Sequence, residues 1–328
     1  MTSPRITTAA AAPWAAAAVV IALAIGSLFV GVAHVDLASL WSDPAAREVF
    51  MLSRLPRTAA LLLAGAGMAI AGLIMQHLAR NRFVAPTTAG TIDAAGLGLL
   101  TATLVFAGAS IMTKILIAMV FALAGTALFL AIVQRIQFKD VIFVPLVGLL
   151  LGGVFSAVSE FFAYRNNLTQ TLSVWMNGDF SGVIQGRYET LWLAGAVALL
   201  AYAFANRFTA AGMGREFATN IGVNHRRWMA AGLAIAALVT AVVVVTVGAI
   251  PFLGLIVPNI VTLMLGDNLR RVLPTTALAG AALVTGCDIL ARLLIFPYEI
   301  PVGTIVGVVG AAVFLVLVMR RGHTYAAA

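Results

Sequence analysis

Long apolar stretches alternate with short polar connections along this chain, a pattern typical of helices that cross a membrane. A helix of about 20 apolar residues spans the roughly 30 Å hydrocarbon core of a bilayer. Ten such segments are expected, at residues 14–34, 57–77, 91–110, 113–134, 141–163, 189–205, 228–250, 252–266, 272–293 and 300–319. The short alternating segments of a membrane β-barrel do not occur in the sequence. The pattern therefore predicts an all-α, polytopic membrane protein with about ten transmembrane helices, folded as one integral membrane domain over residues 1–328.

Composition supports this class and limits the chemistry. The chain is 62% hydrophobic and 10% charged, with a mean hydropathy of +1.05, whereas a soluble domain is about 25% charged. The net charge of +8 is spread along the chain, which favours cytoplasmic loops facing anionic membrane lipid over nucleic-acid binding. Cys287 is the only cysteine, so an internal disulfide and a thiolate metal site are excluded. The first apolar segment is long for a signal peptide, and we interpret it as an uncleaved helix behind a cytoplasmic N-terminus at 1–13.

The distribution of arginine and lysine predicts the orientation. With the N-terminus inside, 13 of the 20 basic residues fall on the inner side and 7 on the outer side, the bias expected for a protein with both termini in the cytoplasm. The outer set comprises Arg47, Arg54, Arg57, Lys114, Arg165, Arg187 and Arg292. The motif RLPR at 54–57 therefore lies outside, where arginine is less common, and this makes the pair a candidate for function.

Two segments are expected to lie outside the hydrocarbon. Residues 35–53 mix apolar and charged positions and are predicted to lie along the outer interface. Residues 207–227 form the longest inner loop, in which Gly214 and Gly222 are expected to separate two short helices.

Proline and glycine positions add two expectations about the last spans. Pro258 is expected to interrupt the eighth span, and neighbouring protein must then satisfy the freed backbone groups. Gly303, Gly307 and Gly310 recur on one face of the tenth helix and indicate close helix packing rather than the lining of a pore.

Motifs of catalysis are missing from the sequence. A phosphate-binding loop is absent, since the only lysines, Lys114 and Lys139, follow Thr113 and Phe138 instead of glycine. His-Glu-x-x-His and Gly-x-Ser-x-Gly patterns do not occur, and the four histidines lie far apart in the sequence. We therefore expect no catalytic residues, no bound metal and no cofactor, and we do not expect an enzyme.

Ionisable residues inside apolar segments are costly, which makes them candidates for function. Asp93 lies near the inner end of the third segment, where capping or interface exposure is the simpler explanation. Glu160, near the outer end of the fifth, either lines a polar path or reaches the surface. Asp288 and Arg292 are four residues apart on one helix face and are placed to pair. A secondary transporter would need a deeper chain of carboxylates than these residues provide.

Three sequence blocks resemble the FecCD-type permeases of ATP-binding-cassette importers, which carry iron–siderophore, haem or cobalamin. They are RLPRTAALLLAGAGMAIAGLIMQHLARN (54–81), GAIPFLGLIVPNIVTLMLGDNLRRVLP (248–274) and DILARLLIFPYEIPVGTIVGVVGAAVFLVLV (288–318). GREFATNIGVNHRRW (214–228) resembles the cytoplasmic coupling segment of that family. NRFVAPTTAGTIDAAGLG (81–98) is similar to permeases for catecholate-type siderophores. The resemblance implies a permease subunit that moves ferric siderophore across the bacterial inner membrane.

The resemblance also implies partners. Two permease subunits, of the same or a paralogous chain, would enclose the path, with two ATP-binding subunits docked beneath and a substrate-binding protein landing on the outer face. Arg54, Arg57 and Arg292 match arginines that bind glutamates of the binding protein. The alternative is that the first two anchor a helix at the headgroups while Arg292 neutralises Asp288.

Contacts with the ATP-binding subunit are implied for five residues of the inner loop. They are Arg215, Glu216, Ala218, Gly222 and Val223, and the alternative is a solvated basic loop. Asn259 and Thr262 stand where the family usually has His and Arg, so no role is carried over to them. The residues that line the translocation path are not predicted. A haem or cobalamin cargo, and a secondary transporter driven by an ion gradient, stay open as alternatives.

Overall fold

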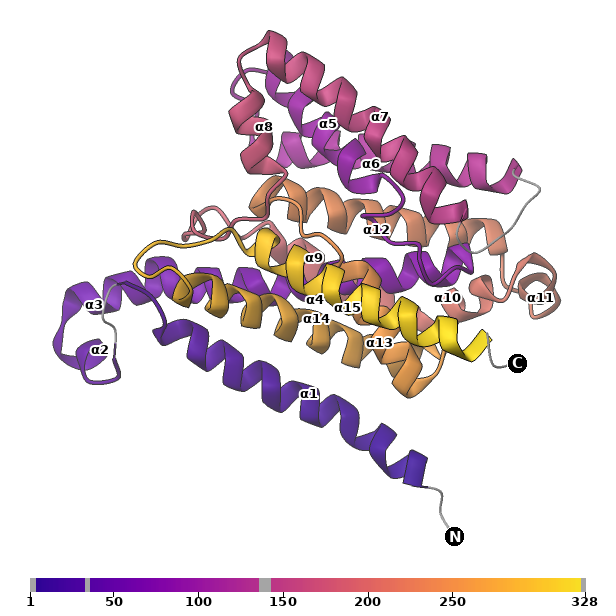
Figure 1. Ribbon diagram of the computed structural model, residues 1–328, viewed down its shortest axis with the longest axis horizontal. Coiled ribbons are helices and arrows are strands. Elements are labelled where there is room, and N and C mark those ends of the chain that lie inside the picture. The colour runs from indigo at the N-terminus through magenta and orange to yellow at the C-terminus, as the bar shows by residue number, and fades with distance from the viewer. Residues whose placement is uncertain (1–3, 33–35, 136–142, 326–328) are drawn as a thin grey trace.

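The structure is a computed structural model that describes residues 4–32, 36–135 and 143–325, and regular structure within these ranges is helical throughout (Figure 1). Lys139 and parts of the predicted segments 14–34, 35–53 and 141–163 lie outside the described residues. The elements are α1 (Pro4–Phe29), α2 (Ser39–Ser42), α3 (Pro44–Val49), the π-helix η1 (Phe50–Arg54), α4 (Leu55–Ala79), α5 (Thr91–Val105), α6 (Ile111–Arg135), α7 (Phe143–Arg165), α8 (Thr169–Trp175), α9 (Leu191–Ala203), α10 (Ala205–Gly212), α11 (Arg215–Asn220), α12 (His225–Val247), α13 (Leu253–Leu265), α14 (Leu269–Leu293) and α15 (Val302–Tyr325).

The chain is a multi-pass membrane protein, although a count of ten spans is not confirmed. Among the described residues, 6 helices are long and apolar enough to cross a bilayer, or up to 7 if α9 and α10, which meet at 68°, form one span. The apolar helices α5 and α13 and the apolar part of α15 are shorter. Each of the ten predicted segments nevertheless coincides with one of these helices. α1 already begins at Pro4, so most of the predicted N-terminal segment 1–13 continues the first helix.

Helix α4 forms the centre of the bundle. The share of buried positions is 78% in its span, against 11% for the apolar part of α1 at the edge. α4 packs against α14, α12, α13 and α9, and this is possible because small residues let the backbones approach. A Cβ added at Gly65 would lie 2.6 Å from the carbonyl oxygen of Gly280 in α14. Alanine at that position would therefore force the two helices apart.

The prediction that Pro258 interrupts the eighth span is wrong, because α13 runs through this residue. Proline has no amide hydrogen, so the carbonyl of Gly254, four residues earlier, loses its helical donor. The Gln76 side chain of α4 supplies one instead, with Nε2 lying 3.4 Å from the oxygen of Gly254 and 3.2 Å from that of Leu255. A side chain of the central helix thus satisfies the backbone that proline leaves open.

The two residues that depart from the family pattern serve the same helix. Asn259 Nδ2 donates to the carbonyl oxygens of Leu255 (2.8 Å) and Arg82 (2.7 Å). Thr262 Oγ1 donates to the carbonyl of Pro258 at 2.8 Å. Both buried side chains are therefore satisfied within the chain.

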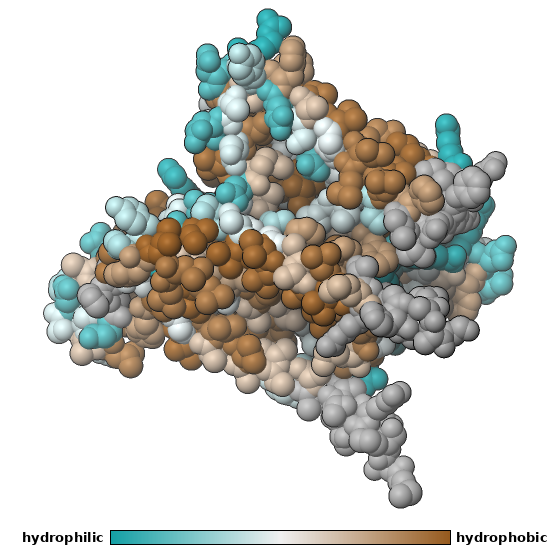
Figure 2. Space-filling model, in the orientation of Figure 1, coloured by the Kyte–Doolittle hydropathy of each residue, from teal (hydrophilic) through white to brown (hydrophobic). Residues whose placement is uncertain are grey.

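The helices are arranged in two parts joined by α12. α5, α6, α7 and α8 form the lobe at the top of Figure 1, while α4, α13, α14 and α15 lie below it, and α12 packs against both α4 and α6. The start of α1, the end of α15 and α11 lie at one end of the bundle, and α2 and α3 at the other. Figure 2 shows an apolar flank over α14 and α15, where Leu293 and Val308 are exposed. Such a flank suits contact with lipid.

The glycine face of α15 confirms the packing interpretation. A Cβ at Gly303 would lie 2.7 Å from the amide nitrogen of Gly178, and one at Gly310 would lie 2.7 Å from Cβ of Phe252. A Cβ at Gly307 would reach Pro251 at 3.4 Å. The face therefore packs against the backbone of Gly178 and the side chains of Pro251 and Phe252.

Candidate functional site

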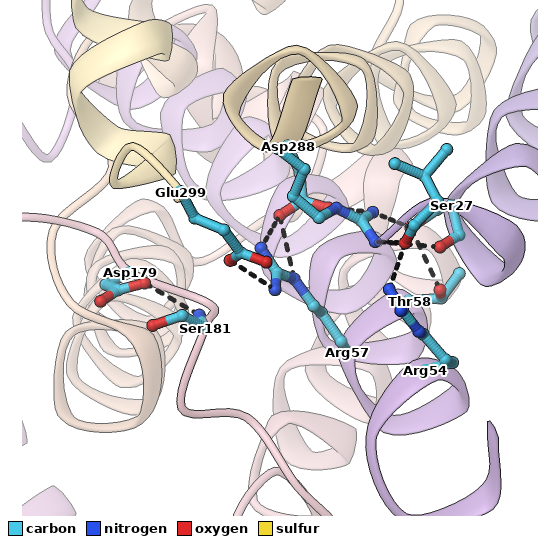
Figure 3. Close-up of polar contacts among 10 residues, drawn as sticks. Ser27, Arg54, Arg57, Thr58, Asp179, Ser181, Asp288 and Glu299 are labelled. Carbon is cyan, nitrogen blue, oxygen red and sulfur yellow. Dashed lines mark hydrogen bonds and ion pairs between the residues drawn. The ribbon is translucent and has the colours of Figure 1, made fainter. Parts of the chain in front are cut away.

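Five charged side chains from two regions that are distant in the sequence meet at the end of the bundle that carries α2 and α3, and four of them are labelled in Figure 3. Arg54 ends η1 and Arg57 lies in the first turn of α4. Asp288 and Arg292 come from the end of α14, and Glu299 precedes α15. We call these five residues the outer charge cluster. The predicted orientation places it on the outer side of the membrane.

The proline of the RLPR motif changes the backbone hydrogen bonding at the start of α4. Pro56 cannot donate to the carbonyl of Leu52, four residues earlier. That oxygen instead accepts the amide of Gln185 from the loop after α8, at 3.0 Å. The chain before Pro56 forms the π-helix η1, a geometry that is often found at functional sites. The motif thus joins the start of α4 to the outer loop.

Arg57 bridges two carboxylates from different parts of the chain. Its Nη2 and Nε lie 2.7 Å and 3.1 Å from Oδ1 of Asp288, and its Nη1 lies 2.8 Å from Oε2 of Glu299. Asp288 is fully buried, whereas the Glu299 side chain is 26% exposed. The pair with Asp288 is therefore shielded from water, and the pair with Glu299 lies at the edge of the cluster.

Arg292 fixes the end of α1 to α14. Its Nη2 pairs with Asp288 and donates to Oγ of Ser27 at 2.7 Å. Its Nη1 donates to the carbonyl oxygens of Val30 (2.6 Å) and Ser27 (3.1 Å). Arg54 also donates to the carbonyl of Val30. Cationic donors at the last carbonyls of α1 satisfy groups that have no partner inside a helix end.

The structure brings the three arginines proposed for docking into one cluster but turns them inward. Arg54, Arg57 and Arg292 are 8%, 7% and 2% exposed. The predicted pairing of Asp288 with Arg292 is confirmed. Sequence reasoning missed Glu299, because an acid in an outer connection, two residues before Pro301, carries no signal of its own. Its distance of 242 positions from Arg57 also hides the contact.

At the opposite end, α10 and α11 confirm the two short helices predicted in the inner loop. Gly214 and Gly222 flank α11 with φ of 111° and 74°, values that favour glycine. Ala218 and Val223 are buried against Trp228, which holds α11 to the start of α12.

The five residues expected at the coupling contact therefore divide into two groups. Arg215, Glu216 and Gly222 are exposed, while Ala218 and Val223 form the support beneath them.

Arg80 connects this inner segment to the central helix. It ends α4 in a left-handed conformation, with φ 50°. Its side chain donates to the carbonyl of Gly212 at 2.9 Å and to that of Met213. The turn before α11 is thereby tied to α4. No sequence pattern indicates this role, because a basic residue after a span is also expected from the positive-inside tendency.

A polar cleft of about 780 Å³ lies between α5, α7 and α8. Asp93 and Glu160 both line it, together with Ser156, Tyr164 and Asn177. Asp93 is half-buried and Glu160 is exposed. The expectation that Asp93 merely caps its helix or meets the interface is therefore incomplete, because Asp93 also lines the cleft. Glu160 lines the cleft and is exposed, so both of its interpretations, the lining of a polar path and a position at the surface, agree with the structure.

Comparison with known proteins gives a consistent result along the chain. Residues 16–320 match the model of the FecCD transport family. The petrobactin import system permease protein YclN of Bacillus subtilis is 50% identical over 303 residues, which is 92% of this chain and 96% of that protein. The ferric-anguibactin transport system permease protein FatD of Vibrio anguillarum is 41% identical over 90% of this chain and 94% of that protein. The vitamin B12 import system permease protein BtuC of Escherichia coli is 33% identical over 86% of this chain and 87% of that protein.

A solved structure described as an inward-facing metal-chelate type ABC transporter agrees with the fold. It has a TM-score of 0.79 and 25% sequence identity, and the match covers 94% of this chain and 98% of that one. The family match extends over nearly the whole chain, and the relatives it groups with are permeases. The chain belongs to the FecCD transport family.

Proposed function

We propose that this chain is the transmembrane permease subunit of an ATP-binding-cassette importer that moves a ferric siderophore across the bacterial inner membrane. The observation that carries the proposal is the similarity over at least 90% of the chain to permeases named for petrobactin and anguibactin, at 50% and 41% identity. The permease named for vitamin B12 is less similar, at 33%. A siderophore is therefore favoured over cobalamin or haem as the cargo.

Membership of this family implies ATP-binding, substrate-binding and second permease partners. The finer proposal is that two ATP-binding subunits dock at the end that carries α11, and that hydrolysis takes place on them rather than on this chain. A second permease, identical or paralogous, completes the path. A substrate-binding protein lands at the end that carries the outer charge cluster.

Transport in proteoliposomes tests the function directly. The chain, its partner subunits and a binding protein are reconstituted, and uptake of labelled cargo is measured, with radioactive iron in a panel of siderophores and in haem, and with radioactive cobalt in cobalamin. Uptake of one ferric siderophore that requires ATP is expected. Uptake that persists without ATP and without the ATP-binding subunit would establish an ion-driven transporter instead. Uptake of cobalamin or haem alone would keep the importer and replace the cargo.

The outer charge cluster is proposed as the docking site of the binding protein. Arginine presents a planar fork that suits carboxylates, and charges at the edge of an interface mainly raise the association rate. Glu299 is the partly exposed carboxylate on Arg57. A carboxylate of the binding protein would therefore approach Arg57 beside Glu299, while the pair of Arg57 with Asp288 stays in place.

Salt dependence of docking provides the test. The transporter in lipid nanodiscs carries Arg57→Gln, which leaves Asp288 paired with Arg292, and association of the binding protein is measured at low and high salt. Arg57→Glu is avoided because it would place a third acid beside Asp288 and Glu299. Weaker association is expected, with the larger effect at low salt, since salt screens such contacts. Arg187→Gln removes another outer arginine as the matched control. Equal association for both variants would refute docking at the cluster.

Helix α11 is proposed as the coupling contact with the ATP-binding subunit. Arg215 and Glu216 face outward from a helix that is packed onto Trp228 and tied to α4 through Arg80. A push on α11 would therefore reach the central helix. Glu216→Lys is expected to weaken retention of the ATP-binding subunit during purification. Asp267→Lys, an exposed acid outside α11, is the control. Full retention with Glu216→Lys would exclude this contact.

A further inference from the structure

A second cleft, at the inner end of the bundle, has the chemistry of a lipid site. It encloses about 890 Å³ between α6, α11 and α12, which converge at the right of Figure 1. Its rim carries Arg215, His225 and Arg226. None of the described residues that line it is an aspartate or a glutamate. The rim is therefore suited to an anion.

The wall beneath this rim is apolar. Leu130 and Ala131 of α6 face Leu233 of α12 across the cleft. A soluble anion would gain nothing from such a wall, whereas an acyl chain would gain by leaving water. Charged donors above an apolar groove, at the end of membrane helices, form the arrangement in which basic pockets hold anionic lipid headgroups. Both guanidiniums are exposed and can donate to phosphate oxygens.

We propose that this cleft binds one anionic phospholipid of the inner leaflet, with its phosphate at Arg215 and Arg226 and an acyl chain between α6 and α12. The site shares Arg215, Gly222 and Val223 with the residues expected at the coupling contact and leaves Glu216 for that contact. Arg215 and Thr219 are four residues apart and line the cleft on one face of α11. Glu216 and Phe217 do not line it and are exposed elsewhere on α11, where the ATP-binding subunit can reach them.

Native mass spectrometry of the full chain in mild detergent tests the proposal. The delipidated protein is titrated with phosphatidylglycerol or with phosphatidylcholine, and the affinity of the first bound lipid is measured. Tighter binding of phosphatidylglycerol is expected. Arg226→Gln should lower that affinity about fivefold, the effect of one basic residue near an anionic headgroup. Arg227→Gln is the matched control, because it removes the same charge from the neighbouring position, which does not line the cleft.

A second variant tests the apolar half of the site. Ala131→Trp fills the groove without changing any charge, and it should also weaken the first bound phosphatidylglycerol. Equal losses for Arg226→Gln and Arg227→Gln would show diffuse attraction by the net charge and overturn the proposal. Undiminished binding with Ala131→Trp, together with displacement of the lipid by inorganic phosphate, would establish an anion site and refute a lipid site. Lipid retention is measured on the chain alone, so the outcome is independent of cargo and partners.

Discussion

Replacement of Asp288 by asparagine should destabilise the protein more than the loss of any other acid in an ion pair described above. Asn keeps the shape of the side chain but removes the charge that faces Arg57 and Arg292. Asp288 is fully buried, and the side chains of these arginines are only 9% and 1% exposed. Two guanidiniums would then be held close together with a single remaining carboxylate, that of Glu299.

The size of the effect follows from burial. Removing one partner of a buried ion pair costs about 3–5 kcal/mol, because the remaining charge stays buried without compensation. Glu299→Gln breaks a pair at a side chain that is 26% exposed, and Arg57 keeps Asp288. Asp267→Asn breaks a pair with Arg82 whose members are 67% and 37% exposed. Pairs of the exposed kind contribute about 0–1 kcal/mol. The expected order of destabilisation is Asp288→Asn, then Glu299→Gln, then Asp267→Asn.

Intrinsic fluorescence during heating in one detergent, at one scan rate, measures this order. The scan rate is fixed because unfolding of membrane proteins is commonly irreversible and the apparent midpoint is then kinetic. A decrease of roughly 5–15 °C is expected for Asp288→Asn and of only a few degrees for the other two variants. A midpoint for Asp288→Asn equal to that of Asp267→Asn would refute the view that the outer charge cluster holds α1, α4 and α14 together.

Three further predictions concern the central helix. Gly65→Ala should lower the apparent melting temperature and the yield of folded protein, at a cost of about 1–3 kcal/mol, because its Cβ would lie 2.6 Å from the oxygen of Gly280. Gly153→Ala in α7, where nothing lies within 4 Å, is the control, and equal effects would contradict the close crossing. Gln76→Leu should cost about 1–3 kcal/mol in melting experiments. The destabilisation by Gln76→Leu should be smaller in a protein that also carries Pro258→Ala, because alanine restores the amide that donates to the carbonyl of Gly254. An equal destabilisation in both backgrounds would show that Gln76 does not replace the missing amide donor. Arg80→Gln should reduce the cargo moved per ATP hydrolysed several-fold while the ATP-binding subunit stays bound, as measured in proteoliposomes. An equal decrease in cargo moved per ATP with Arg82→Gln would show that Arg80 has no specific role in coupling.

Sequence reasoning predicted the helices well because apolar length is a local property. Boundaries were less accurate where tertiary contacts decide them. Pro258 taken alone suggests a break, whereas in the structure the helix continues and the side chain of Gln76, brought close by the crossing of α4 and α13, donates to the carbonyl that proline leaves without a helical donor. The tenth-helix glycines were interpreted correctly, since small residues on one face indicate packing wherever the partner lies.

The candidate sites were less predictable for the same reason. Asp288 and Arg292 are one turn apart, so their pairing follows from helix geometry alone. The contacts of Arg57 with Asp288 and Glu299 depend on how α4 and α14 cross, which no local pattern encodes. The family resemblance selected Arg54, Arg57 and Arg292 together, but it could not indicate that all three are buried. Arg80 and the basic cleft beside α11 were hidden among the basic residues that any inner loop carries.

The central position of α4 has a consequence for biogenesis. Arg57 is inserted near the start of synthesis, yet its buried carboxylate, Asp288, lies 231 residues later in the chain. The helices that enclose α4 (α9, α12, α13 and α14) also follow it in sequence. During translation we therefore expect α4 to enter the bilayer before its packing partners, with its glycine faces exposed to lipid and its arginines at the headgroups. The last helices to leave the ribosome close the bundle, and a chain truncated before Asp288 would leave Arg57 without its buried partner.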